Sequence, residues 1–187
     1  MAVVRSLSKK PSRSEPSKSP APKALATPTD LDADKVAKVA DAINKVLADT
    51  FVLYLKTKNF HWHVSGKHFR DYHLLLDEQA AAIYATIDPL AERVRKIGRE
   101  TVHSYAEILA LTALKESEEG FLSPEAMFEA LIADNKAAIK TMRAAHAVAD
   151  EAEDIATASL LEEYVDEAEK RLWFLFETNQ NRQDSAT

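Results

Sequence analysis

The chain has 187 residues, 46% of them hydrophobic, which is enough to bury one core and form one folded domain. It contains no cysteine, which excludes disulfides and thiolate metal sites and suits a reducing cytosol. No apolar run approaches the roughly 18 residues of a membrane span, and no secretory signal is visible. Few glycines and long stretches rich in Ala, Leu, Glu and Lys favour an all-α protein, and we expect a cytoplasmic one from the absence of cysteine.

The net charge of −6 is unevenly distributed along the chain. Residues 1–29 contain one acid, Glu15, and have a net charge of +5, whereas residues 30–187 hold 18 basic and 29 acidic groups. We therefore expect an acidic body with a basic N-terminal tail. The six cations of this tail are Arg5, Lys9, Lys10, Arg13, Lys18 and Lys23.

The tail, residues 1–30, has six serines and five of the seven prolines, with almost nothing to bury, and is predicted to be disordered. An organelle-targeting peptide is the alternative, because the segment is rich in serine and poor in acids. Its prolines would, however, break the amphipathic helix that such peptides need.

Apolar residues then recur at three- and four-residue steps and predict long helices in chain order. The first runs from Leu31 to near Gly66, and the second covers residues 69–97 and stops at Gly98. Pro89 lies inside the second helix and predicts a kink there, because it lacks an N–H and its ring crowds the carbonyl of Ala85.

The rest of the chain predicts two more long helices after a crossover over residues 101–122. This crossover includes a short helix over residues 105–114. Ser123, Pro124 and Glu125 have the pattern of a helix start, and the third helix continues to about Val148. A fourth helix follows residues 150–154 and ends near Glu177, leaving residues 180–187 as a short C-terminal tail. Residues 31–179 thus predict a four-helix bundle.

Five side chains able to bind a metal ion lie within 32 residues: His61, His73, Asp77, Asp88 and Glu92. On a continuous second helix, the last four would fall within about 100° of one face. Asp77 and Asp88 would nevertheless lie about 16 Å apart along the axis. One helix cannot close both around an ion, whereas a second copy of the chain running antiparallel could.

A solvated helix face is the alternative explanation for these acids and histidines. Three observations favour a metal site instead: the shared face, the small or aromatic residues Ala80, Ala81 and Tyr84 between the ligands, and Trp62 beside His61. Neutral imidazole with carboxylate suits iron, manganese or zinc. An internal di-metal centre of the Glu-x-x-His type is not expected, because that spacing occurs once, at Glu100 and His103, just past a helix stop.

These residues resemble those of the Dps family, the mini-ferritins that protect DNA in starved bacteria. The resemblance rests on Asn59-Phe60-His61-Trp62, Gly66, His68-Phe69, His73 with Asp77, and Asp88-Pro89-Leu90-Ala91-Glu92-Arg93. Counted from the first histidine, the ligand spacings of twelve, sixteen, twenty-seven and thirty-one match the family pattern. The helical layout over residues 31–179 matches as well.

The resemblance implies a ferritin-like four-helix subunit with a short helix in its crossover, assembled into a hollow homo-dodecamer. Di-iron ferroxidase centres would lie at two-fold interfaces, with His61 and His73 from one subunit and Asp88 and Glu92 from its neighbour. Asp77 would be a further ligand or support the ligands. The implied substrates are Fe(II) and hydrogen peroxide, and the ferric product would be stored as mineral. Two readings stay open for Trp62: packing beside the site, or scavenging of an oxidising equivalent.

The family also implies iron entry through acidic three-fold pores, for which Glu153 and Asp154 are the candidates. Ala158 stands where relatives often have an acid, and the alternative for this cluster is a helix N-terminus that favours negative charge. The basic tail implies non-specific DNA binding and a nucleoid-associated location, against the alternative of a tail without a partner. Two rival functions remain, a nucleoid architectural protein with little iron chemistry and a plain helical scaffold.

Overall fold

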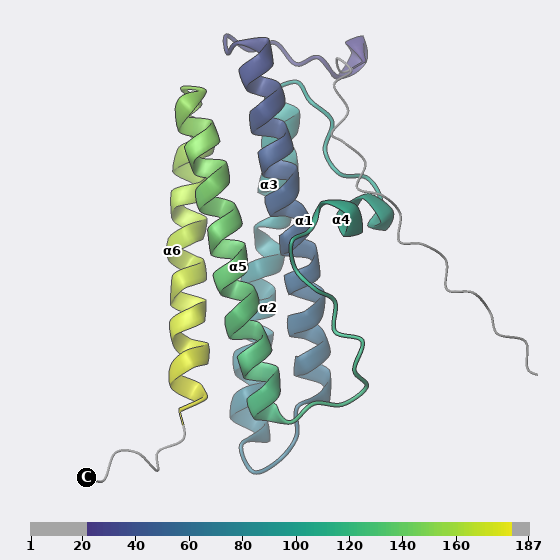
Figure 1. Cartoon of the computed structure of the whole chain (residues 1–187), viewed down its shortest axis with the longest axis vertical. Helices are drawn as coiled ribbons and strands as arrows, with labels where there is room; N and C mark the ends of the chain where they lie inside the picture. Colours follow the sequence, from purple (N-terminus) through teal and green to yellow (C-terminus); the bar gives the residue numbers. More distant parts are fainter. Residues whose placement is uncertain (1–21, 181–187) are drawn as a thin grey trace, which may run out of the picture.

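The computed structural model describes residues 22–180, and all the regular structure in that range is helical. Figure 1 shows long helices running alongside one another as rods, and one of these rods is interrupted along its length. The elements are η1 (Lys23–Leu25), α1 (Ala33–His63), α2 (Phe69–Ala85), α3 (Ile87–Lys96), α4 (Tyr105–Leu111), α5 (Pro124–Glu151) and α6 (Ile155–Thr178). The predicted all-α four-helix bundle with a short helix in the crossover is confirmed.

The long helices begin at capping residues that the sequence contains. Asp32 accepts hydrogen bonds from the backbone N–H groups of Asp34 and Lys35 at the start of α1. Ser123 caps α5, with Pro124 at its first position, as predicted. Each long helix buries one face in a common core. This core includes Ile43 and Leu47 of α1, Leu131 of α5 and Leu161 of α6.

The prediction of one continuous helix over residues 69–97 is wrong, because α2 and α3 are separated at Thr86. Pro89 has no N–H to donate to the carbonyl of Ala85, so the helical ladder is interrupted one turn earlier. The N–H of Thr86 donates instead to Ile83 O at 3.2 Å, and the Thr86 hydroxyl donates to the same oxygen at 2.8 Å. The predicted kink is therefore a helix break.

The crossover between α3 and α5 is fastened to α1 by two buried side chains. The carboxylate oxygen Oδ1 of Asp49 accepts hydrogen bonds from the Thr112 hydroxyl and the Ala113 N–H, both at 2.7 Å. The ammonium of Lys56 donates to Asp134 of α5 and to the carbonyl of Lys115. These contacts hold the crossover and α4 against the outer side of α1, where Figure 1 shows them.

Two residues before the expected boundary at residue 31 contact the body. The Thr27 hydroxyl donates to Arg95 O at 2.9 Å, and the Arg95 guanidinium donates to Leu25 O at 3.0 Å. Gly98, at φ +77°, leaves room for this contact, since a Cβ there would lie 2.7 Å from Thr27 O. Leu25 and Thr27, which fall within the expected disordered tail, therefore contact the body.

The remaining predictions for the tails fall outside the described residues, namely disorder over residues 1–21 and a short tail beyond residue 180. Within residues 22–180, no helix combines the length and apolar character needed to cross a membrane.

Candidate metal centre

His61 and His73 form a compact pair at the junction of α1 and α2. Nδ1 of His61 lies 2.8 Å from His73 O, and Nδ1 of His73 lies 2.8 Å from His61 O. The rings stack with their centroids 3.8 Å apart. Because a carbonyl oxygen only accepts, each Nδ1 must be the donor, which leaves Nε2 of a neutral ring with a free lone pair. Both imidazoles are thus held in the tautomer that a metal ion requires.

Asp77 adds a carboxylate to this pair from the next turn of α2. Its Oδ1 lies 3.9 Å from Nε2 of His61 and accepts a hydrogen bond from Lys58 Nζ at 2.7 Å. The hydrogen bond and charge of Lys58 lower the pKa of the Asp77 carboxyl below its usual value. Asp77 is therefore an anion that already has a cation beside it.

The sequence reasoning missed Lys58. Its position was available as a signal, because Lys58 lies three residues before His61 on α1 and so one turn away on a similar face. Its side chain is 18% exposed, so it lies against the body instead of extending into water. We name His61, His73, Asp77 and Lys58 the histidine half-site.

Asp88 and Glu92 lie one turn apart on α3, and both are exposed. Glu92 pairs with Lys96 at 3.1 Å, with both side chains more than half exposed. The backbone that presents them is fixed from the other side of α3, where Arg93 donates to Thr157 and Asp154 of α6 at 2.7 and 2.6 Å. We name Asp88 and Glu92 the carboxylate half-site.

One chain does not assemble the whole predicted ligand set. Within residues 22–180, no three His, Asp or Glu side chains are placed together to hold a metal ion. The histidine half-site contains the stacked pair of His61 and His73, with Asp77 Oδ1 3.9 Å from Nε2 of His61, and the carboxylate half-site holds the other two predicted residues on α3. This division agrees with the axial-distance argument from the sequence.

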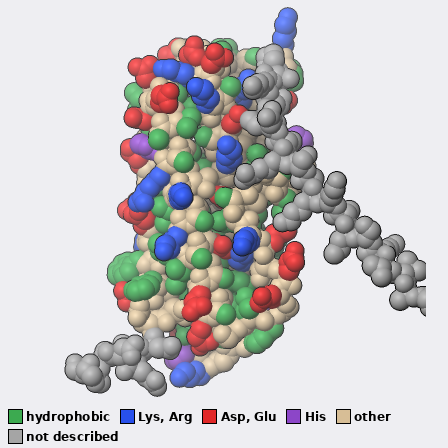
Figure 2. All heavy atoms as spheres, in the orientation of Figure 1, with side chains coloured by type: hydrophobic (Ala, Val, Ile, Leu, Met, Phe, Trp, Pro, Cys, Tyr) green, Lys and Arg blue, Asp and Glu red, His purple; other side chains and the backbone are tan. Residues whose placement is uncertain are grey.

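Large apolar side chains of α1 and α2, the helices that form the histidine half-site, are exposed. Trp62, next to His61, is 59% exposed and so does not pack inside its own chain, and Tyr84 is 60% exposed. Leu55, Phe69 and Leu74 of the same two helices are exposed as well. Figure 2 shows a different face, over α5 and α6, where charges of both signs alternate and an apolar cluster lies toward the lower end of α6. Large exposed apolar side chains beside an incomplete ligand set fit a surface that another molecule covers.

Asp154 has a structural task at the turn between α5 and α6. It is buried, caps the N-terminus of α6 by accepting from Thr157 N at 3.0 Å, and pairs with Arg93. Burial alone would raise the pKa of this carboxyl, but the hydrogen bonds from Arg93 and Thr157 outweigh it and lower the pKa. Glu153 is exposed, at φ +61°, and faces Lys35 at 3.5 Å. Of the two predicted pore acids, the structure therefore leaves only Glu153 facing solvent.

Of the predicted DNA-binding cations, Lys23 lies in η1. The others, Arg5, Lys9, Lys10, Arg13 and Lys18, lie outside the described residues.

Comparison with known proteins decides the family. The family model of the ferritin-like domain matches residues 40–182. A DNA protection during starvation protein from Brevibacillus brevis is 36% identical over 137 residues, which is 73% of this chain and 91% of the relative. The chain belongs to the Dps family. The resemblance drawn from the ligand spacing is thus confirmed.

Solved Dps structures have the same fold. Dps from Thermosynechococcus elongatus matches with a TM-score of 0.77 and 32% identity, covering 82% of this chain and 98% of that one. A Dps protein from Vibrio cholerae, described as a member of a broad superfamily of ferritin-like diiron-carboxylate proteins, matches with a TM-score of 0.78 and 28% identity. The match covers 83% of this chain and 98% of the Vibrio cholerae chain.

Proposed function

We propose that this Dps protein is a ferroxidase and iron-storage mini-ferritin whose catalytic site is shared between two subunits. The observation that supports this most strongly is the reciprocal pairing of His61 and His73, which fixes both Nδ1 atoms as donors and leaves both Nε2 atoms for metal. Asp88 and Glu92 of a neighbouring subunit supply the carboxylates. The diiron-carboxylate character of the Vibrio cholerae relative supports the same chemistry.

The donor set fits ferrous iron, which accepts imidazole nitrogen together with carboxylate oxygen. In the proposed reaction, two Fe(II) ions each lose one electron, and one hydrogen peroxide takes up both electrons and two protons. Its O–O bond breaks, and two water molecules form. Because both electrons are taken at one site, no hydroxyl radical is released, and the ferric product is then stored as mineral.

The residues of the chain have separate tasks in this scheme. His61 and His73 bind through Nε2, and the backbone carbonyls that hold their Nδ1 atoms keep the rings oriented. Asp77 binds iron directly or supports the ligands, and the ammonium of Lys58, which pairs with the Asp77 carboxylate, is displaced when a metal ion binds there. Trp62, next to His61 in the sequence, packs beside the completed site, and scavenging of an oxidising equivalent is its alternative role.

The decisive test is the rate of Fe(II) oxidation by hydrogen peroxide, followed by stopped-flow absorbance. His61→Ala and Asp88→Ala should each slow oxidation by on the order of 100-fold or more, because each removes a direct ligand. His63→Ala is the matched control, since His63 is exposed and its ring hydrogen-bonds only to Asn59 O. Wild-type rates in either ligand variant would refute the site assignment.

The assembly is proposed to be a homo-dodecamer, in which two-fold contacts bring a histidine half-site against a carboxylate half-site. The exposed apolar residues Leu55, Trp62 and Tyr84 of α1 and α2 support such a contact. Light scattering should report a mass of about twelve 20.8 kDa chains, and negative stain should show hollow spheres. A monomer would contradict the shared site.

Non-specific DNA binding is proposed for the basic tail, which places the protein in the cytoplasm and at the nucleoid. One support is the charge of +5 on residues 1–29, which an oligomer would carry once for each subunit. The other is that relatives of the chain are named for DNA protection. A gel shift should compare the full chain with a chain that lacks residues 1–21. This deletion leaves the docked contacts of Leu25 and Thr27 intact.

The full chain should bind DNA more tightly than the truncated chain, and its affinity should fall steeply with salt. Equal, salt-insensitive behaviour of the two chains would refute the tail's role. If DNA binding is normal and His61→Ala leaves iron oxidation unchanged, the rival function of a nucleoid architectural protein is correct. Iron entry past Glu153 belongs to the same proposal, while Asp154 contributes by holding the α5–α6 turn.

A further inference from the structure

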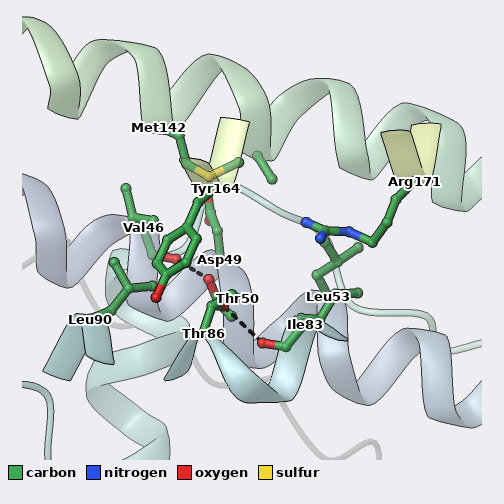
Figure 3. Close-up of a pocket in the computed structure, with 11 residues that line it drawn as sticks. Val46, Asp49, Thr50, Leu53, Ile83, Thr86, Leu90, Met142, Tyr164 and Arg171 are labelled. Atoms are coloured by element: carbon green, nitrogen blue, oxygen red, sulfur yellow. Dashed lines mark hydrogen bonds between the residues drawn. The ribbon is translucent and has the colours of Figure 1, made fainter. Parts of the chain in front are cut away.

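A small cavity lies inside the bundle, behind the break between α2 and α3 (Figure 3). Its volume is about 20 Å³, and α1, the α2–α3 junction, α5 and α6 all contribute to its walls. Most of the lining is apolar, with residues such as Leu53, Ile83 and Met142. The polar side chains that line it come from Asp49, Thr50, Thr86, Tyr164 and Arg171.

Two charged side chains of this lining have buried atoms that lack a hydrogen-bond partner. Asp49 is only 1% exposed, and its Oδ1 is occupied by Thr112 and Ala113, but its Oδ2 is unpaired. On Arg171, Nε and Nη1 are buried and unpaired, and Nη1 lies 4.0 Å from the nearest oxygen of Glu167. Buried polar atoms in folded proteins almost always find a partner, and a buried charge without one is strongly unfavourable.

We propose that the cavity is a binding site for one ordered water molecule that donates to Asp49 Oδ2 and accepts from the Arg171 guanidinium. The cavity volume fits this ligand, because a buried cavity needs a volume of roughly 10–15 Å³ to hold one water molecule. The wall offers an acceptor and donors in addition to hydroxyl groups, which supplies the two to four polar partners that a buried water needs.

A neutral ligand fits better than an ion. The carboxylate of Asp49 and the guanidinium of Arg171 carry opposite charges, so the lining of the cavity has no net charge to attract a cation or an anion. The other polar side chains of the lining, Thr50, Thr86 and Tyr164, are neutral. Burial and the nearby Glu163 and Glu167 raise the pKa of Tyr164 to about 12, so its phenol keeps its proton. A dipole that both donates and accepts satisfies this lining, whereas an ion satisfies half of it.

The position of the water gives it a role in the fold. Thr86 is the residue at which α2 ends and α3 begins, and Ile83 and Leu90 on either side of it also line the cavity. Hydrogen bonds that link Asp49 of α1 to Arg171 of α6 through the water brace the bundle directly behind this break. The water therefore supports the angle between the helix that carries His73 and the helix that carries Asp88. This inference does not depend on iron oxidation.

Crystals of the full-length protein grown in sodium bromide test the ligand class. Data collected at the bromine absorption edge should show a water-like peak within hydrogen-bonding distance of Asp49 Oδ2 and Arg171, without anomalous signal. A bromide peak, an empty cavity, or a direct contact between Asp49 and Arg171 would overturn the proposal.

A double-mutant cycle tests whether the water couples the two charges. Asp49→Asn and Arg171→Met should each lower the thermal midpoint by several degrees, and together they should lower it by less than the sum. Asn keeps an oxygen for Thr112 and Ala113, so the crossover stays fastened. The matched control pairs Thr112→Val with Arg171→Met, which should be additive because Thr112 contacts Asp49 away from the cavity. Additivity in the Asp49–Arg171 cycle would contradict a shared water.

Discussion

The two half-sites of this protein are built in opposite ways. The histidine half-site is held by hydrogen bonds within one chain: His61 and His73 fix each other through backbone carbonyls, and Lys58 holds Asp77. The carboxylate half-site lies open on α3, where Glu92 has an exposed pair with Lys96. The first is preorganised, whereas the second depends on where its helix is placed.

The difference follows from the chemistry of the proposed ligands. An imidazole binds metal through one nitrogen, and the other nitrogen must carry the proton, so its orientation and tautomer have to be fixed in advance. A carboxylate has two equivalent oxygens and no tautomer, so it tolerates a looser position. The carboxylates therefore depend mainly on the position of α3. Arg93 fixes that position by donating hydrogen bonds to Asp154 and Thr157 at the start of α6.

The largest effect on stability should come from breaking that support of α3. Asp154→Ala removes the carboxylate that pairs with Arg93, leaving only the hydrogen bond to Thr157, and removes the cap of α6, so we expect a loss of about 3–5 kcal/mol in the free energy of unfolding. Thermal or urea unfolding measures this loss. Metal binding should weaken as well, because the carboxylate half-site is no longer held in place.

Glu153→Ala is the control for this prediction, because Glu153 is the neighbouring acid but is 85% exposed. Its replacement should change stability by less than about 0.5 kcal/mol. Equal effects of the two variants would mean that the buried pair of Asp154 and Arg93 does not fix α3.

Replacing Lys58, whose ammonium pairs with the Asp77 carboxylate, should have a smaller effect, and this effect should be on metal affinity. Lys58→Met should raise the affinity for Co(II) by several-fold, up to about tenfold, because the metal no longer displaces an ammonium. Isothermal titration of the purified protein measures this change, and Lys45→Met, an exposed lysine of the same helix, should leave it unaltered. A lower affinity would show that Lys58 positions Asp77 for the metal instead of competing with it.

The smallest effect on stability and activity is expected at the carboxylate half-site. Lys96→Ala removes an exposed i,i+4 pair with Glu92, which is worth less than about 0.5 kcal/mol. Urea unfolding should hardly change, and the rate of iron oxidation should stay within about twofold. A large loss of activity would mean that Lys96 organises Glu92, and the contrast between the two half-sites would disappear.

Much of this architecture could be predicted from local sequence signals. Apolar periodicity located the long helices, and Ser123 with Pro124 located the start of α5, because a helix face and a cap depend on residues a few positions apart. The family followed from the spacing of the ligands. The break at Thr86 was expected only as a kink, since the sequence shows that Pro89 lacks a donor but not how the freed groups are satisfied.

The features that escaped prediction depend on residues far apart in the sequence. The docking of Thr27 on Arg95 joins positions 68 residues apart, and the pairing of Arg93 with Asp154 joins positions 61 residues apart. Lys58 was not among the predicted residues, because its pairing with Asp77 depends on how α1 and α2 pack against each other. The cavity between Asp49 and Arg171 needed the packing of the whole bundle.

The central claim is that each site takes one half from each of two subunits, and mixed oligomers test it most directly. His61→Ala and Asp88→Ala chains should each be inactive alone, but at an interface between them one of the two sites keeps both intact halves. Random reassembly of equal amounts should therefore restore about a quarter of the wild-type rate of iron oxidation. A mixture as inactive as its two components would show that both halves of each site belong to the same chain, and would contradict this account.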